Sequence, residues 1–133
     1  MEIFEVFNEA EQIIVYNEGE EKSYQRGSEP YACIAECWYT MIKGAHDMPA
    51  YGVSLNRETV KALNSGLWVE FDFGKEMQAN GMPFEKLLIN VQKDFYGFNL
   101  IRYTSQRGYD GRCFYFDLVG KNMSNLYDLL INL

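Results

Sequence analysis

The stretch Leu67-Trp68-Val69-Glu70-Phe71-Asp72-Phe73 indicates a β-strand with one fully apolar face. Successive side chains of a strand point to opposite faces, and every odd-numbered position here is apolar. The even-numbered positions, Trp68, Glu70 and Asp72, would lie on the second face. Carboxylates beside a tryptophan can bind a ligand or partner or perform acid–base chemistry, whereas on an open sheet they are simply its polar face. These three side chains are candidate site residues.

Two further strands are expected, one before and one after Gly108-Tyr109-Asp110-Gly111, which has the composition of a turn. The surrounding segment, Phe95 to Leu118, is rich in aromatic residues and arginine, the residue types that dominate binding energy at interfaces. A turn with an even number of residues, two or four, would put the apolar side chains of both strands on one face, and the four-residue turn would place Arg102 opposite Asp117 as an ion pair. An odd number would place Arg102 among phenylalanines, where desolvation costs free energy, so the even register is expected.

In that register most aromatic side chains of the hairpin belong to the core. The side chains that remain for a partner lie on the second face and at the tip. The alternative is a purely structural hairpin with a solvated tip. The candidates are Arg102, Arg107, Tyr109, Arg112, Tyr115 and Asp117.

Short β-branched and aromatic runs at Ile3–Phe7 and Gln12–Tyr16 predict an N-terminal hairpin, and a more polar strand follows from Glu20. Helix starts are recognised by a capping side chain followed by an acid or a proline. The loop Ala45 to Ser54 separates the first two helices. The expected helices begin at Ser28-Glu29-Pro30, at Asn56, and at Asn122 or Ser124.

Residues 84–95 fit two interpretations. Apolar residues recur there at helical spacing, with a proline before them and a glycine after them, so a helix is preferred. The apolar run Leu87-Leu88-Ile89-Asn90-Val91 instead favours a strand, and this alternative stays open. With the helix, the element order is ββ(β)-αα-β-α-ββ-α. We therefore expect one α+β domain, residues 1–133, with about five mainly antiparallel strands and three to four helices on one face.

Charge and composition limit the classes of partner. The net charge is −7, and residues 1–29 contribute most of it, with eight acids against two bases. This distribution disfavours nucleic acid, which needs a basic surface, and it permits a basic protein partner. No stretch approaches the ~20 apolar residues of a membrane helix, and the N-terminus lacks a signal-peptide pattern. We expect a cytoplasmic protein with no membrane partner.

The cysteine and histidine residues do not form a recognisable catalytic or metal-binding motif. Cys33 and Cys37 lie four residues apart, which is not the spacing of a redox pair. A zinc site would have to combine them with His46 and Cys113, so buried free thiols are the preferred interpretation. No motif indicates a cofactor or a metal. His46 is the single histidine, so any histidine-dependent mechanism would require it.

The absence of a recognisable catalytic motif favours a non-catalytic protein-binding or regulatory module, of the inhibitor or immunity type. The alternative is a small-molecule-binding domain or small enzyme with its site near Trp68, Glu70, Asp72 and His46. Self-association through the hairpin or a strand edge would give a homodimer. Neither the partner nor a substrate follows from the residues.

Overall fold

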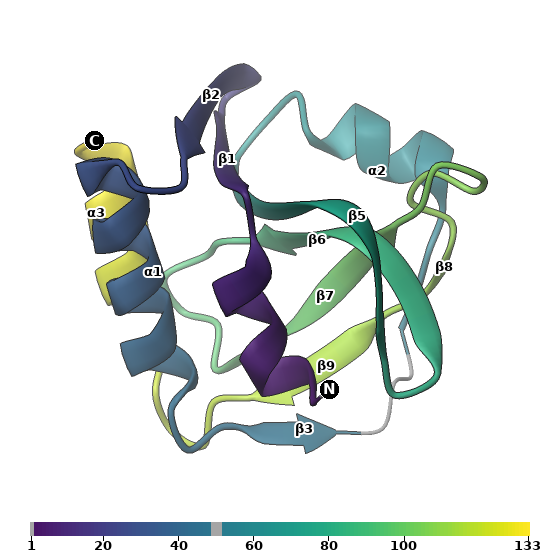
Figure 1. The fold of residues 1–133 in the computed structure, drawn as a ribbon. Coiled ribbons are helices and arrows are strands. Elements are labelled where there is room, and N and C mark those ends of the chain that lie inside the picture. The colour runs from purple at the N-terminus through teal and green to yellow at the C-terminus, as the bar shows by residue number, and fades with distance from the viewer. Residues whose placement is uncertain (1, 49–51) are drawn as a thin grey trace.

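A computed structural model describes residues 2–48 and 52–133. Within these ranges the chain forms a seven-stranded sheet of order β2-β1-β5-β6-β7-β9-β3, a two-stranded sheet, β4-β8, and four helices (Figure 1). The helices are η1 (Ile3–Glu9, a 3-10 helix), α1 (Glu29–Ile42), α2 (Asn56–Ala62) and α3 (Ser124–Ile131). The strands are β1 (Gln12–Asn17), β2 (Glu20–Gln25), β3 (His46–Met48), β4 (Val53–Ser54), β5 (Leu67–Ala79), β6 (Met82–Asn90), β7 (Gly97–Tyr103), β8 (Gly111–Arg112) and β9 (Phe114–Asp117).

The predicted class, α+β with a mainly antiparallel sheet, is confirmed. Each pairing between neighbouring strands in the described ranges is antiparallel. The main sheet has seven strands rather than about five. Strand β3 lies within the expected loop Ala45 to Ser54 and pairs with β9, and β6 lies where a helix was preferred. Residues 49–51 of that loop lie outside the described ranges.

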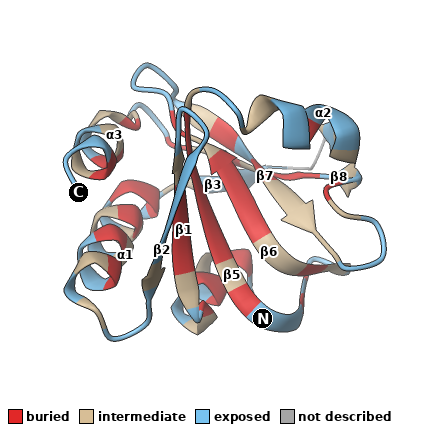
Figure 2. Cartoon of the chain, turned by 90° about the horizontal axis from the view of Figure 1, so that it is seen from above, coloured by how far each residue is buried: buried red, intermediate tan, exposed pale blue. Residues whose placement is uncertain are grey.

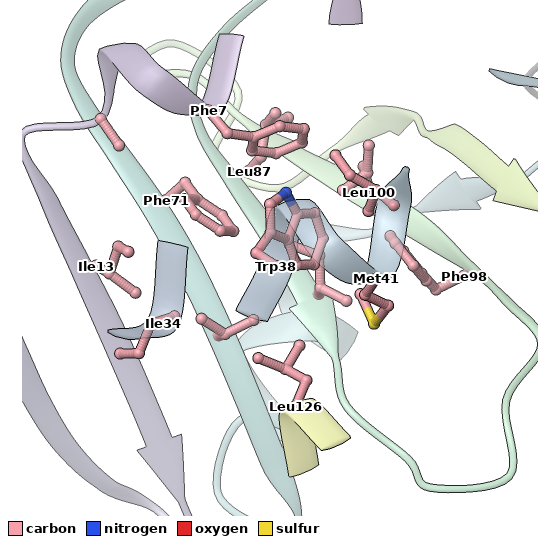
Figure 3. Close-up of a cluster of buried hydrophobic side chains, with 14 of the residues drawn as sticks. Phe7, Ile13, Ile34, Trp38, Met41, Phe71, Leu87, Phe98, Leu100 and Leu126 are labelled. Carbon is pink, nitrogen blue, oxygen red and sulfur yellow. The ribbon is translucent and has the colours of Figure 1, made fainter. Parts of the chain in front are cut away.

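Helices cover both faces of the sheet, and not one face as expected. Figures 1 and 2 show α1 and α3 on one side of the strands and α2 on the other. The main core lies on the α1 side, where the indole of Trp38 packs at 4.9 Å from the ring of Phe71 (Figure 3). The smaller cluster on the α2 side consists of Trp68, Leu88 and Tyr109.

Helix α1 follows its sequence signals closely. The Ser28 hydroxyl accepts a hydrogen bond from the backbone N–H of Tyr31, which satisfies one of the donors left over in the first helical turn. Ile34 and Trp38 point into the core and have no exposed surface. Burial of this stripe holds the helix against the sheet.

The expected N-terminal hairpin is wrong in its first strand, because Ile3–Phe7 belongs to the helix η1. Phe4 stacks on Phe116 with ring centroids 4.5 Å apart, and Phe7 lies edge-on to Trp38 at 4.9 Å. Tertiary packing of these rings overrides the local β propensity. The hairpin is formed instead by β1 and the polar strand β2.

The preferred helix at residues 84–95 is also wrong, and the strand alternative is correct for residues 82–90. Strand β6 is buried on both faces, with Leu87 in the main core and Leu88 in the smaller cluster. A strand buried on both faces is a nearly continuous apolar run. Such a run matches helical spacing by chance, which explains the error.

The expected register of the last hairpin is wrong as well. Gly97 pairs with Asp117 and Phe98 pairs with Phe116, so Arg102 does not face Asp117. Instead Arg102 is half-buried and donates hydrogen bonds of 2.7 Å from Nε to the carbonyl of Arg112 and from Nη1 to that of Pro83. Burial lowers its pKa. The two carbonyls offset the desolvation cost that made this register look unfavourable.

Candidate functional site

The second face of β5, where the sequence placed Trp68 and Glu70, is not an open polar surface. Trp68 is buried, and the Glu70 side chain has no exposed surface. Ala62 and Leu63, at the end of α2, pack against the cluster around Trp68. The helix and the loop before β8 therefore cover this part of the sheet.

Glu70 is held by two tyrosines. The hydroxyl of Tyr16 donates to Oε1 at 2.8 Å, and the hydroxyl of Tyr109 donates to Oε2 at 2.6 Å. Burial raises the pKa of Glu70, although both hydrogen bonds act in the opposite direction. Burial and the neighbouring carboxylate raise the pKa values of Tyr16 and Tyr109. All the hydrogen bonds that the structure gives to this carboxyl come from these tyrosines, which suits a structural role.

Tyr109 also connects the covering loop to α2. Its backbone N–H donates to Asn56 Oδ1 at 2.9 Å, and its carbonyl accepts from the Ser54 hydroxyl. In return, Asp110 Oδ1 accepts from the backbone N–H of Asn56 at 2.6 Å, in the first turn of α2. The sequence candidate Tyr109 is therefore an anchor for the loop and not an exposed contact residue.

Beside Trp68 lies a groove of about 560 Å³, within the size range of ligand sites. Three of the sequence candidates line it: Trp68 from β5, Tyr115 from β9 and Asp117 at the end of β9. The loop between β6 and β7 adds Phe95, which is 39% exposed, and Tyr96, which is 57% exposed. The groove lining is Trp68, Asn90, Asp94, Phe95, Tyr96, Gly97, Phe98, Asn99, Ile101, Tyr115 and Asp117.

Local structure fixes the side chains of the groove. The indole N–H of Trp68 donates to the carbonyl of Ser65 at 2.9 Å. Asp117 accepts a hydrogen bond from the backbone N–H of Val119 at 2.9 Å. Tyr115 lies directly over Gly97, where an added Cβ would be 3.0 Å from Tyr115 Cζ. Only glycine at position 97 leaves room for this phenol ring.

The charge of the groove is negative. Asp94 and Asp117 contribute carboxylates, and none of the described lining residues is basic. The nearest cation in sequence, Lys93, forms an ion pair of 3.0 Å with Asp128. Aromatic rings with carboxylates at the rim can hold a cation by charge attraction and by cation–π contact.

The residues of the enzyme hypothesis occupy separate places. Trp68 lines the groove, whereas Glu70 is buried. Asp72 accepts a 2.7 Å hydrogen bond from Gln12 Nε2. His46 is exposed on β3, where it pairs with Asp117 across the strands. These four side chains do not converge on one pocket lining in the described structure.

The arginines of the last hairpin lie away from the groove. Arg102 and Arg107 line a smaller pocket of about 320 Å³ together with acidic side chains, among them Glu76, Glu85 and Asp110. Arg112 is exposed on β8. The sequence candidates therefore divide between the groove, the Glu70 cluster and this arginine region.

None of the cysteines lines the groove, and Cys33 and Cys37 both line a separate pocket beside α1. Cys113 is buried as expected, but Cys37 is only partly buried and Cys33 is exposed on α1. Exposure of Cys33 contradicts the expectation that all three thiols are buried, because position 33 lies on the solvent side of the helix. Among the residues that the structure describes, no group of three or more His, Cys, Asp and Glu side chains could hold a metal ion.

Comparison with models of protein families, with curated proteins and with solved structures finds no match for this chain. In the described ranges, no helix has the length and apolar character needed to cross a membrane.

Sequence reasoning missed the residues that the β6–β7 loop contributes to the groove. The helical interpretation of residues 84–95 places Asp94 and Phe95 at the end of a helix and Tyr96 after it, so it predicts no rim there. The available signal was the aromatic pair Phe95-Tyr96, which follows the charged residues Lys93 and Asp94 and precedes Gly97. The long-range contact of Tyr16 with Glu70 had no local signal.

Proposed function

We propose that this protein is a non-catalytic binding module whose groove receives a basic side chain, lysine or arginine, from a partner protein. The observation that carries the proposal is the composition of the groove, with exposed aromatic rings and two carboxylates and no basic residue among the described lining. An inhibitor or immunity-type role, in which the module covers a basic surface of its partner, is the form of regulation that we favour.

A protein segment suits the groove better than a small molecule does. Small-molecule sites enclose most of the ligand surface and are lined mainly by apolar side chains. Here the rim side chains Asp94, Phe95 and Tyr96 are exposed. Tyrosine and phenylalanine at an open rim are typical of contacts between proteins, where such rings bury large areas on association.

The overall charge supports the same partner. The net charge of −7 attracts a basic protein over the distance of the Debye length, about 8 Å at physiological salt. Attraction of this kind speeds association and favours basic partners over acidic ones. Unpaired cysteine thiols fit a reducing compartment, so we place the module in the cytoplasm.

The test is a nuclear magnetic resonance titration of the nitrogen-15-labelled protein with a Gly/Ser peptide that carries one central arginine. The expected result is that amide signals of residues 94–99 and 115–117, with the Trp68 indole signal, move on addition of peptide. The shifts should weaken as salt is added, because exposed charge pairs are screened. A peptide with glutamate in place of arginine should produce no such shifts.

The matched variants are Asp94→Asn with Asp117→Asn in the groove, and Glu5→Gln with Glu36→Gln on the opposite side of the sheet. Both pairs remove the same charge, and Glu5 and Glu36 are exposed on η1 and α1. The groove pair should lose the shifts, and the control pair should keep them. Equal behaviour of the two pairs, or shifts scattered over the surface, would overturn the proposal.

A further inference from the structure

A second pocket continues the groove toward the turn between β1 and β2. It measures about 400 Å³ and shares Asn90 and Asp94 with the groove. Its far wall is formed by Asn17 and Glu18 of the β1–β2 hairpin, and Tyr127 of α3 also lines it. Asn90 and Asp94 therefore form the boundary between two adjoining depressions.

Two hydrogen bonds hold Asn90 at this boundary. Asn90 Nδ2 donates to the carbonyl of Leu67 at 3.1 Å, and Asn90 Oδ1 accepts from Gln92 Nε2 at 2.7 Å. Because both ends of the Asn90 amide are held, this side chain does not swing into either pocket. The two depressions keep a defined relation to each other.

Glu18 supplies the second pocket with a carboxylate in a fixed place. Its backbone N–H donates to the carbonyl of Gly66 at 2.9 Å, and its Oε1 accepts from the backbone N–H of Gly66 at 3.2 Å. Glu18 has φ 50° and Gly19 has φ 86°, the left-handed pair of a tight hairpin turn. The turn and Gly66 together hold the carboxylate at the pocket wall.

Lys93 is the only basic residue in the described lining of either pocket. Its ammonium group lies 3.0 Å from Asp128 and 5.0 Å from the centre of the Tyr127 ring. The charge of Lys93 is thus offset by α3. Glu18, Asp94 and Asp117 leave a negative track that runs through both pockets.

Resting on the proposed function, we infer that the partner is an extended segment with two basic side chains, one in the groove and one in the second pocket. The chain between them crosses Asn90 and Asp94. Residues two apart in an extended chain lie on the same side and advance about 3.3 Å per residue. The two basic residues are therefore separated by an even number of positions, and we expect one such spacing to fit both pockets better than the others.

The experiment measures dissociation constants for Gly/Ser peptides with one arginine, or with two arginines separated by two, four or six positions. The peptide with one of these spacings should bind about five-fold more tightly than the other two peptides. This is the gain in affinity expected when the same peptide chain makes one added exposed charge pair. Glu18→Gln should remove this preference and leave the one-arginine peptide unaffected. The substituted glutamine side chain can still accept the hydrogen bond from Gly66, so the variant removes only the charge.

The matched control is Glu20→Gln, which makes the same charge change on β2 at an exposed residue outside the lining of both pockets. It should keep the spacing preference. The two-pocket inference fails if all spacings bind alike or if the two variants behave alike. The proposed function still stands in that case, provided that the double change Asp94→Asn and Asp117→Asn abolishes binding of the one-arginine peptide. If that peptide does not bind the groove at all, both fail.

Discussion

The hydroxyl of Tyr109 donates a 2.6 Å hydrogen bond to the carboxylate of Glu70, a side chain with no exposed surface. These residues are 39 positions apart in the chain. The bond attaches the loop before β8 to the middle of the sheet, under α2. It also satisfies a buried charge that would otherwise oppose folding.

Replacing Tyr109 with phenylalanine should destabilise the protein by about 1.5–3 kcal/mol, the range for a hydrogen bond to a charged group. Urea unfolding measures the change as a lower midpoint at an unaltered slope. Tyr96→Phe is the control, since Tyr96 is 57% exposed. Similar midpoints for the two variants would contradict the structural role of the Tyr109 hydroxyl.

The stability of the protein should depend on pH through Glu70. Because burial raises the pKa of this carboxyl in the folded state, its contribution is fully present below the ordinary glutamate pKa of about 4.3 and is lost as the pH rises through the folded value. Glu70→Gln cannot titrate. Relative to this variant, the natural protein should therefore lose stability as the pH rises.

Denaturant unfolding of both proteins at several pH values between about 4 and 8 tests this expectation. Lys86 and Asp72 are charged neighbours of Glu70 that influence its pKa. Both residues are present in the two proteins, so the difference between the curves isolates Glu70. Parallel curves would mean that the Glu70 pKa is the same in the folded and unfolded chains.

Neighbouring residues of β6 should both be costly to truncate. Leu87 and Leu88 have no exposed surface and lie on opposite faces of the sheet. Each change to alanine should destabilise by about 2–5 kcal/mol. Leu55→Ala, at a residue that is 59% exposed, should cost less than about 0.5 kcal/mol. A small effect at either β6 position would contradict a strand buried on both sides.

Gly97→Ala should disturb the groove. The new Cβ would be 3.0 Å from Tyr115 Cζ and 2.8 Å from the carbonyl oxygen of Phe116, so we expect a loss of about 1–3 kcal/mol in stability and weaker binding of the one-arginine peptide. In a Tyr115→Ala background the same change should cost less, because one of the two clashes is absent. Equal costs in both backgrounds would show that the Tyr115 ring does not press on position 97.

Much of the fold was accessible from the sequence wherever neighbouring residues carried the signal for an element. The alternation of Leu67 to Phe73 predicted β5, and the serine, acid and proline at residues 28–30 predicted the start of α1. These signals are local. In β5 the strand signal survives burial of both faces, because Glu70 and Asp72 keep polar residues alternating with apolar ones. The α+β class followed from these local signals.

The errors arose where long-range packing decided the structure. The run at residues 84–91 loses its strand periodicity because both faces are buried. Asn80-Gly81, with φ values of 51° and 74°, forms the turn between β5 and β6 and is a strong hairpin signal in the sequence. This turn signal favours a strand on both sides of it, against the helical spacing of the apolar residues.

The candidate site was predicted in part. Trp68, Tyr115 and Asp117 line the groove, because they lie on the face of the sheet that the main core does not use. Burial of Glu70 could not be predicted, since the covering residue Tyr109 comes from a loop far along the chain. The same holds for the rim at Asp94 to Tyr96, whose position depends on β6 being a strand.

Tyr109 links the loop at residues 104–110 both to α2 and to the sheet. This linkage should affect local unfolding. Hydrogen bonds join Tyr109 to Glu70, Asn56 and Ser54, so the loop cannot detach without disturbing the start of α2. These segments should open together as one cooperative unit. Their backbone amides would then exchange with solvent deuterium at a common free energy, separate from that of α1 and its core.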